Sequence, residues 1–229
     1  MRLSIIIPTL NEAANIEATL RPLQAMRARA VEIIVVDGGS SDATRELAMP
    51  LVDRVMQSAA GRATQMNAGA NVATGDILLF LHADSLLSNH PNGADDLIAA
   101  ALATPQAQWG RFDVNISGSH FMFPIIAWFM NQRSRLTGIA TGDQGIFVRR
   151  IAFTRLGGFP DQPLMEDIEF SQRMGKLCLP VFIAARLGTS GRRWEKHGVW
   201  RTIGLMWRLR WRYWRGVSAA EIHRAYHGR

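Results

Sequence analysis

The sequence predicts an α/β fold in which a mostly parallel sheet is flanked by helices. Unbroken apolar runs at residues 5–7, 33–36 and 78–81 are typical of strands buried on both faces, because strands with a solvent face alternate. Helical patterns separate these runs over the first part of the chain, which favours parallel pairing through right-handed crossovers.

Turn signals bound the elements expected in the first half. The strand at 4–8 stops at Pro8, and Asn11 is expected to cap the next helix, which Pro22 should kink or end. The other elements expected here are strands at 31–36, 51–56 and 76–81 and a helix or helical loop at 61–73.

The alternation loosens in the second half. The elements expected there are helices at 95–103 and 166–177, strands at 109–116, 145–148 and 181–184, and a helical tail from Trp194. The apolar stretch 121–130 is too short to cross a bilayer, which takes about 20 apolar residues. The predicted organisation is one α/β domain over 1–195 and a basic, aromatic helical tail over 196–229.

Composition and charge limit the function classes. The chain has 229 residues, 48% of them hydrophobic, which suits one domain with a sizeable core. The formal net charge is +7 and is carried largely by arginine, which favours phosphate and carboxylate partners. The single cysteine excludes an internal disulfide, and the N-terminus does not resemble a signal peptide. We expect a cytoplasmic protein, with a peripheral position on the inner face of the membrane if the tail binds lipid.

The end of the central strand is the main candidate site. His82 and Asp84 follow the apolar run 78–81 at the carboxyl end of a buried strand, where open α/β sheets bind ligands. We predict that Asp84 holds a divalent cation and, through it, the phosphates of a nucleotide. His82 either takes part in this site or hydrogen-bonds a backbone carbonyl.

Three further groups carry candidate chemistry. Asp37 ends the second strand, is expected to share a crevice with Asp84 at the end of a neighbouring strand, and either binds a nucleoside or caps the next helix. Arg62, near a helix start, either meets a diphosphate or is solvated. The adjacent Glu166 and Asp167 either supply a general base or complement a helix dipole.

The order of these motifs resembles glycosyltransferase family 2. The residues that carry the resemblance are Pro8 with Asn11-Glu12, the turn 37–42, Arg62 with Asn67 and Gly69, the acid at 84, and Glu166-Asp167. The segments 61–69, 81–84, 142–145 and 163–167 are similar to a bacterial subfamily found beside radical-SAM and selenium-linked genes. The resemblance covers residues 2 to about 195.

The resemblance implies a fold, a reaction and a cofactor. The fold is GT-A, a Rossmann-like mixed and mostly parallel sheet flanked by helices. The reaction inverts the anomeric carbon of a nucleotide-diphosphate sugar, with a UDP-sugar as the expected donor and Mn²⁺ or Mg²⁺ as cofactor. Asp167 is the expected base beside Glu166, and Asp84 the metal-binding acid. His82 replaces the first acid of the D-x-D motif, which removes one negative charge from the site.

The remaining implied site residues fall into three groups. The nucleotide and donor set is Pro8, Glu12, Asp37, Arg62, Gln65, Asn67, His82 and Asp84. The residues expected at the acceptor or the donor sugar are Asp143 and Gln144. Those expected at the diphosphate are Arg192, Arg193 and Trp194.

The tail combines tryptophan with arginine. One helical stripe holds Trp200, Ile203, Trp207, Trp211 and Trp214, and the adjoining face holds Arg201, Arg208, Arg212 and Arg215. This composition fits a helix over 197–215 that lies on a membrane surface and would bring the protein to a lipid-linked acceptor. Alternatively, the tryptophans pack on the domain. Nucleic-acid binding is not expected, because no recognised nucleic-acid module accompanies the patch.

Two other functions stay open from the sequence. A sugar-1-phosphate nucleotidyltransferase would carry a glycine-rich loop after the first strand, where this chain has residues 8–12 without glycine. The other alternative is a nucleotide-sugar or membrane-surface binding protein without transferase activity, for which His82 is the hint.

Overall fold

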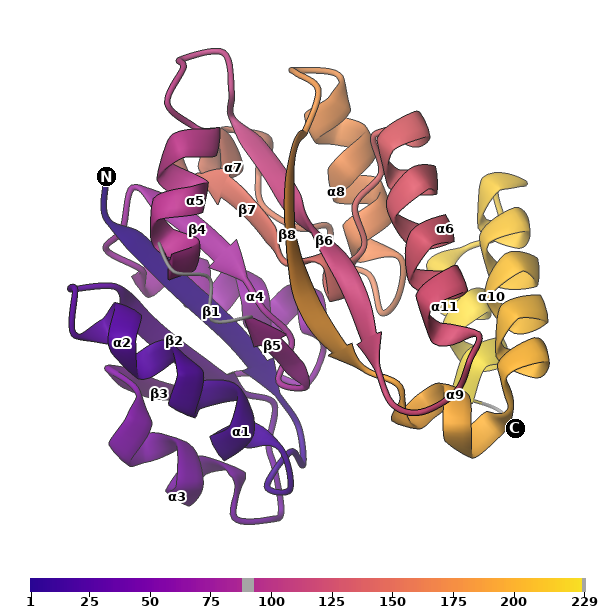
Figure 1. The fold of residues 1–229 in the computed structure, drawn as a ribbon, viewed down its shortest axis with the longest axis horizontal. Helices are drawn as coiled ribbons and strands as arrows, with labels where there is room; N and C mark the ends of the chain where they lie inside the picture. The colour runs from indigo at the N-terminus through magenta and orange to yellow at the C-terminus, as the bar shows by residue number, and fades with distance from the viewer. Residues whose placement is uncertain (88–92, 228–229) are drawn as a thin grey trace.

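One mixed sheet organises the computed structural model, which describes residues 1–87 and 93–227 (Figure 1). In these ranges eight strands follow the order β3-β2-β1-β4-β7-β6-β8-β5. The strands are β1 (Leu3–Thr9), β2 (Glu32–Asp37), β3 (Arg54–Gln57), β4 (Ile77–Phe80), β5 (Ser85–Leu87), β6 (Trp109–Ser117), β7 (Ile146–Arg149) and β8 (Val181–Ser190). The predicted α/β class with a mixed sheet is confirmed.

Helices cover both faces of the sheet (Figure 1). The longer ones are α4 (Arg62–Val72), α5 (Gly93–Ala101), α6 (Phe123–Thr137), α8 (Glu166–Gly175), α10 (Val199–Trp214) and α11 (Ala219–His227). The shorter ones are α1 (Ile16–Leu20), α2 (Gln24–Arg27), α3 (Thr44–Ala48), α7 (Arg150–Leu156) and α9 (Arg192–His197), with 3₁₀ turns η1 (Arg21–Leu23), η2 (Met49–Leu51) and η3 (Gly142–Gln144).

The pairing of the strands brings several chain segments to one edge. β1 pairs in parallel with β2 and β4, and β2 with β3, as predicted for the first half. β7 runs antiparallel to β4, so the segment that enters β7 lies beside the segment that leaves β4. The carboxyl ends of β1, β2 and β4 and the loop before β7 therefore share one edge.

The unbroken apolar runs are explained by a core on each face of the sheet. In β1, Ile5 and Ile7 pack in one cluster with residues of α1 and α5. Ile6 points the other way and packs with residues of α4, α7 and α8. Because successive side chains of a strand alternate between faces, a strand covered on both sides is apolar throughout.

Several local predictions need correction. Asn11 does not cap the next helix: α1 begins at Ile16, and the Asn11 side chain instead accepts a hydrogen bond from the Ser41 N–H at 2.9 Å. Pro22 does interrupt the helix, in η1 between α1 and α2. The apolar stretch 121–130 lies mostly in α6, and the last strand is longer than expected, since β8 continues to Ser190.

The helical tail packs on the rest of the chain, but not through its tryptophans. Leu209 of α10 and Ile222 of α11 are buried in a cluster with Met165 and Ile168, beside the start of α8. Trp200, Trp207, Trp211 and Trp214 are exposed, so the alternative in which they pack on the domain is wrong. Within the described ranges, no helix combines the length and apolar character needed to cross a bilayer. The division at residues 195 and 196 stays a prediction.

Candidate active site

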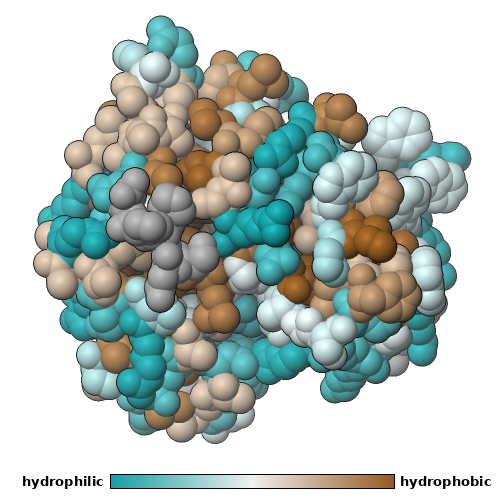
Figure 2. Space-filling view, viewed as in Figure 1, coloured by the Kyte–Doolittle hydropathy of each residue, from teal (hydrophilic) through white to brown (hydrophobic). Residues whose placement is uncertain are grey.

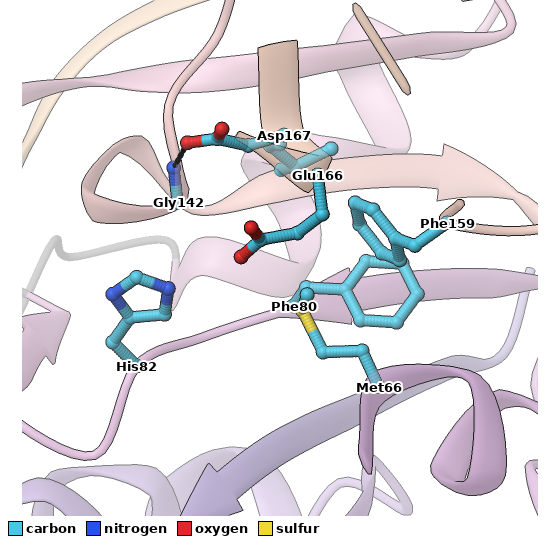
Figure 3. Close-up of a pocket in the computed structure, with 8 residues that line it drawn as sticks. Met66, Phe80, His82, Gly142, Phe159, Glu166 and Asp167 are labelled. Atoms are coloured by element: carbon cyan, nitrogen blue, oxygen red, sulfur yellow. Dashed lines mark hydrogen bonds between the residues drawn. The ribbon is translucent and has the colours of Figure 1, made fainter. Parts of the chain in front are cut away.

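A narrow pocket lies at the sheet edge where β4 ends (Figure 3). Its lining residues come from α4, β4 and the segment after it, the loop before β7, β7, the loop before α8 and α8 itself: Met66, Phe80, His82, Gly142, Ile146, Phe159, Glu166 and Asp167. Phe80 and Ile146 are register partners in the sheet. The segment that leaves β4 and the segment that enters β7 therefore meet just beyond the sheet, which brings His82 next to Gly142.

The two acids of the pocket are the first residues of α8. Met165, which precedes them, is buried and has a left-handed backbone (φ 65°), uncommon for a bulky residue. Asp167 accepts hydrogen bonds from the N–H groups of Gly142 (2.9 Å) and Ile168 (2.8 Å). The Glu166 carboxylate extends into the pocket toward His82, whereas that of Asp167 turns to Gly142 (Figure 3). The first turn of α8 thus directs both carboxylates toward the loop that contains Gly142 and toward the end of β4.

Burial makes both carboxylates weaker acids than usual. Burial raises the pKa of Glu166, and the negative charge of Asp167 raises it further. Burial also raises the pKa of Asp167, and Asp143 adds to that rise, while the hydrogen bonds from the Gly142 and Ile168 N–H groups and the charge of Arg62 oppose it. Adjacent acids of this kind titrate together, and a raised pKa suits a carboxylate that takes up a proton during a reaction.

His82 connects the end of β4 to the loop before β7. Its Nδ1 lies 3.3 Å from Oδ1 of Asp143. Its Nε2 is buried without a hydrogen-bond partner among the described residues, and a Cβ at Gly142 would come within 2.3 Å of it. The alternative in which His82 bonds a backbone carbonyl is therefore not what the structure shows.

Asp37 is enclosed in its own turn. It is fully buried and accepts hydrogen bonds from the N–H groups of Gly39 (2.9 Å) and Ser40 (2.8 Å), from the Ser40 hydroxyl and from Thr9. Burial by itself would raise its pKa, but these hydrogen bonds hold the pKa of Asp37 below its ordinary value. The alternative in which Asp37 caps the next helix is wrong, because α3 begins at Thr44 after Ala43 and Asp37 instead stabilises the turn that follows β2. β1 also separates β2 from β4, so Asp37 and Asp84 do not end neighbouring strands.

Gln65 and Asn67 of α4 are bonded to the backbone of other segments. Gln65 Nε2 donates to the carbonyls of Thr9 and Val36, both at 2.8 Å. The Asn67 amide donates to the carbonyl of Phe159 and accepts from its N–H, both at 2.9 Å. These two expected donor-binding residues hold the scaffold of the pocket together rather than presenting free polar groups.

The other expected donor-binding residues lie at or near the same edge. Pro8 is buried in β1 opposite Val36. The Glu12 carboxylate accepts a hydrogen bond from Asn15 (2.7 Å) and lies 4.0 Å from the guanidinium of Arg192. The chain therefore brings an expected diphosphate residue to an expected nucleotide residue.

The remaining residues predicted to contact the donor or its diphosphate have different surroundings. Arg62 is exposed at the start of α4, and its positive charge opposes the rise in the pKa of both pocket acids. Trp194 is packed against the cluster of Val114 and Phe123 rather than standing free. The side chain of Arg193 lies outside the described residues.

The two polar residues of η3 have different surroundings. Asp143 is half-exposed beside His82. Gln144 is fully buried, and its Oε1 accepts a hydrogen bond from the Thr141 N–H at 3.0 Å. Its Nε2 is buried without a hydrogen-bond partner in the described part of the chain. Of the two, only Asp143 is open to a bound sugar as the loop stands.

Arg133 lies close enough to the pocket acids to interact with their charges, and the sequence did not single it out. It lies on α6, and its Nε and Nη2 are buried without hydrogen-bond partners among the described residues. Burial lowers the pKa of Arg133, while the nearby charges of Asp167 and Asp143 oppose this shift. Its only sequence signal is a cation next to an apolar stretch, and only the fold shows which acids it faces.

Of the predicted metal-binding motif, one carboxylate, that of Asp84, could act as a metal ligand. No group of three or more His, Cys, Asp or Glu side chains in the described ranges is arranged to hold a metal ion. Asp84 is half-buried in the turn after β4, while Nδ1 of His82 is directed at Asp143. Mg²⁺ is commonly held by one or two carboxylates together with substrate phosphates. Asp84 therefore fits a cation that shares its ligands with a diphosphate, while Nδ1 of His82 is occupied by its contact with Asp143.

The mixed α/β sheet with an acidic pocket at the end of β4 has a GT-A-like architecture. The chain belongs to glycosyl transferase family 2, whose family model matches residues 4–156. The PGL/p-HBAD biosynthesis glycosyltransferase of Mycobacterium tuberculosis is 41% identical over 91 residues, 37% of this chain and 36% of that relative. The chain thus aligns with little more than a third of that relative's length.

Solved structures share the fold over most of this chain. The mannosyltransferase PcManGT from Pyrobaculum calidifontis, in complex with GDP-Man and Mn²⁺, has a TM-score of 0.60 at 26% identity, covering 82% of this chain and 56% of that one. S. aureus TarS 1–349 in complex with UDP-GlcNAc has a TM-score of 0.64 at 18% identity, covering 83% and 58%. The second likeness is one of fold alone.

Proposed function

We propose that this protein transfers a sugar from a nucleotide-diphosphate sugar, with a UDP-sugar as the first candidate, to an acceptor hydroxyl with inversion. The observation that carries the proposal is the pocket that joins the end of β4, the loop before β7 and the acids of α8. Membership of glycosyl transferase family 2 supports it, as do the GDP-Man and UDP-GlcNAc bound in the structural neighbours.

Asp167 is the proposed general base. It takes the proton of the acceptor hydroxyl as that oxygen attacks the anomeric carbon. The bond to the diphosphate breaks on the opposite face, and its electron pair leaves with the diphosphate. The raised pKa of Asp167 and the hydrogen bond that holds it to the Gly142 N–H support this role. Glu166 is the second carboxylate of the pocket, and its charge contributes to the joint titration of the pair.

Asp84 is the proposed protein ligand of Mn²⁺ or Mg²⁺. When bound, the cation would neutralise charge on the departing diphosphate. Arg62 and Arg192 are the proposed cationic contacts of the diphosphate, together with Arg193. Arg62 is supported by its electrostatic effect on both pocket acids, and Arg192 by its position 4.0 Å from Glu12.

The first test is a transfer and donor-hydrolysis assay with UDP-, GDP- and dTDP-sugars, with and without Mn²⁺. Asp167→Asn should lower turnover by about 10² or more, because it removes a proton acceptor. Nucleotide binding, followed by thermal shift, should stay near that of the wild type. An equal loss of binding would contradict the role as base, and Glu166→Gln is the matched control for loss of a neighbouring charge.

The same assay separates the two alternatives. A sugar-1-phosphate nucleotidyltransferase would release pyrophosphate from a nucleoside triphosphate and a sugar phosphate. A binding protein would shift its melting temperature with a nucleotide sugar but show no hydrolysis or transfer. Either result would replace the proposal.

The finer classification and the acceptor are also proposals. The motifs at 61–69, 81–84, 142–145 and 163–167 support placement in the radical-SAM-associated bacterial subfamily. The exposed tryptophans of α10 support a lipid-linked acceptor and a peripheral position on the membrane. The cytoplasmic location stays a prediction from the single cysteine.

A further inference from the structure

The outward face of α10 is aromatic. Trp200, Trp207, Trp211 and Trp214 are 71%, 75%, 57% and 79% exposed. The helix packs inward through other positions, with Val199, Thr202 and Leu209 buried. A helix that only needed an anchor on the domain would bury its largest apolar rings, and tryptophan is highly buried on average in folded proteins. The outward rings of α10 therefore need an explanation outside the packing of the chain.

The neighbouring helix α6 adds to this surface. Trp128 and Phe129 are 55% and 60% exposed. The two helices touch through a shared cluster in which Ile126 of α6 packs with Val199 of α10. Pale aromatic and brown apolar side chains gather over these two helices in Figure 2, where they lie side by side at the right of the view. We call the exposed rings of α6 and α10 the aromatic face: Trp128, Phe129, Trp200, Trp207, Trp211 and Trp214.

The charge beside the aromatic face is positive. Arg201 and Arg208 of α10 and the following Arg215 are exposed, and α10 contains no acidic residue. A bilayer with anionic lipids supplies the complementary charge, and tryptophan favours the headgroup region because its ring is apolar while its N–H remains hydrogen-bonded. A helix with tryptophan beside arginine and too polar to span is typical of one that lies in the interface.

We propose that the aromatic face docks the protein on an anionic lipid bilayer, with α6 and α10 lying in the plane of the interface. The occupant follows from the combination of rings and arginines. A surface that binds an apolar protein partner would carry few charges at its centre. A surface that binds nucleic acid would belong to a recognised nucleic-acid-binding module, and the sequence contains no such module.

The docking helix is joined directly to the catalytic pocket. Leu209, on the inward side of α10, is buried with Met165 and Ile168, which flank the Glu166-Asp167 pair. Tyr213 of α10 also donates a hydrogen bond at 3.5 Å to Glu169 of α8. A bilayer under α10 would therefore lie at a fixed place relative to the pocket acids. This part of the inference rests on the proposed function: it names a hydroxyl carried by a membrane lipid as the acceptor class.

Vesicle flotation of the full chain tests the docking without any donor. The wild type should float with vesicles of phosphatidylcholine and phosphatidylglycerol, bind weakly to phosphatidylcholine alone, and be released as salt rises. The variant Trp207→Gln/Trp211→Gln should lose binding by about tenfold or more, because both rings would leave the interface. The matched control is Ile151→Gln/Leu179→Gln, which removes two apolar side chains that are each 80% exposed elsewhere, and it should bind as the wild type does.

Three results would overturn the docking. They are no flotation of the wild type with anionic vesicles, equal flotation of the tryptophan variant, and equal loss in the control. If sedimentation instead shows a dimer that dissociates in the tryptophan variant, the face binds a second copy and the lipid proposal is wrong. Circular dichroism checks that both variants fold.

Donor hydrolysis in solution separates this inference from the proposed function. Neither Trp207 nor Trp211 lies in the pocket, so their variant should hydrolyse a soluble nucleotide sugar as the wild type does. Hydrolysis without flotation would contradict the docking proposal and be consistent with the transferase proposal. Flotation without hydrolysis or transfer would contradict the transferase proposal and be consistent with the docking proposal.

Discussion

Glu166 and Asp167 show how the fold sets the chemistry of single residues. An acid at a helix start is usually solvated and stabilised by the helix dipole. Here α8 begins directly after the left-handed Met165, and burial raises the pKa of both carboxylates. Burying the two acids in this way lowers the stability of the folded protein at neutral pH. Pairs of acids with raised pKa values are frequent at functional sites.

Glu166→Gln should make the protein more stable at neutral pH. The folded pKa of Glu166 is raised by burial, so the wild type is most stable when this acid is protonated and loses that stability as pH rises through the raised pKa. Glutamine cannot ionise, so the variant's advantage should grow with pH and disappear in acid. Urea unfolding across a pH series measures this difference.

The control for this prediction is Glu17→Gln. Glu17 pairs with Arg21 on the surface, where both side chains are largely solvated. Its effect on the free energy of unfolding should be small, below about 1 kcal/mol. A Glu166 effect that is the same at every pH would contradict burial as the cause.

Arg133→Gln should shift the pH dependence of turnover upward. The Arg133 cation lies near Asp167 and Asp143, and removing it would raise the pKa of Asp167 further. The pH of half-maximal kcat should therefore increase. Arg135→Gln is the control, because Arg135 pairs with Asp113 at 2.7 Å rather than with the pocket acids. An unchanged pH profile for Arg133→Gln would remove it from the site.

The helix α4 carries much of the scaffold on which the pocket is built. Gln65 connects it to the ends of β1 and β2, and Asn67 connects it to Phe159. Gly69 lets it approach the sheet closely, since a Cβ there would come within 2.5 Å of Ile6. These contacts fix the position of the helix start, where Arg62 stands.

Gly69→Ala should destabilise the protein by about 1–3 kcal/mol, because the added methyl overpacks the contact with β1. The ordinary effect of this change in a helix has the opposite sign, a gain of about 0.5–1 kcal/mol. Gly175→Ala in α8 should show that gain, since no atom lies within 4 Å of its added Cβ. Thermal unfolding of both variants measures the contrast, and equal effects would contradict the close approach.

The first half of the molecule was predictable at the level of elements because its signals are local. Apolar runs such as 78–81 identify buried strands from their own composition, and Pro22 marks a break wherever it occurs. Asn67 and Phe159 are 92 positions apart, so neither carries a sequence signal of the other. The roles of Asp37 and Arg133 likewise depend on neighbours that only the folded chain supplies.

In the whole molecule the helical tail packs on the rest of the chain through two clusters, one with α6 and one beside the acid pair. The family model ends at residue 156, and the acids at 166 and 167 lie beyond it, between the sheet and α10. The segment that completes the pocket is thus the segment on which the tail packs. This arrangement predicts that perturbing α10 on its inward side, at Leu209, would reach the acid pair.

Leu209→Ala should lower transfer activity as well as stability. Loss of a fully buried leucine costs about 2–5 kcal/mol. Because Leu209 packs on Met165 and Ile168, the loosened contact also displaces the acid pair. The measurement is kcat at a temperature where circular dichroism shows the variant folded. A kcat equal to that of the wild type would mean that the tail does not support the pocket.

We propose that the end of β4, the loop before β7 and the start of α8 form one donor site, with Asp84 as its metal ligand just beyond the pocket residue His82. Donor-dependent turnover of Asp84→Ala, measured with a UDP-sugar in the presence of Mn²⁺, tests it most directly. We predict that turnover is abolished while the variant melts as the wild type does without nucleotide. Turnover at the wild-type rate would contradict the site.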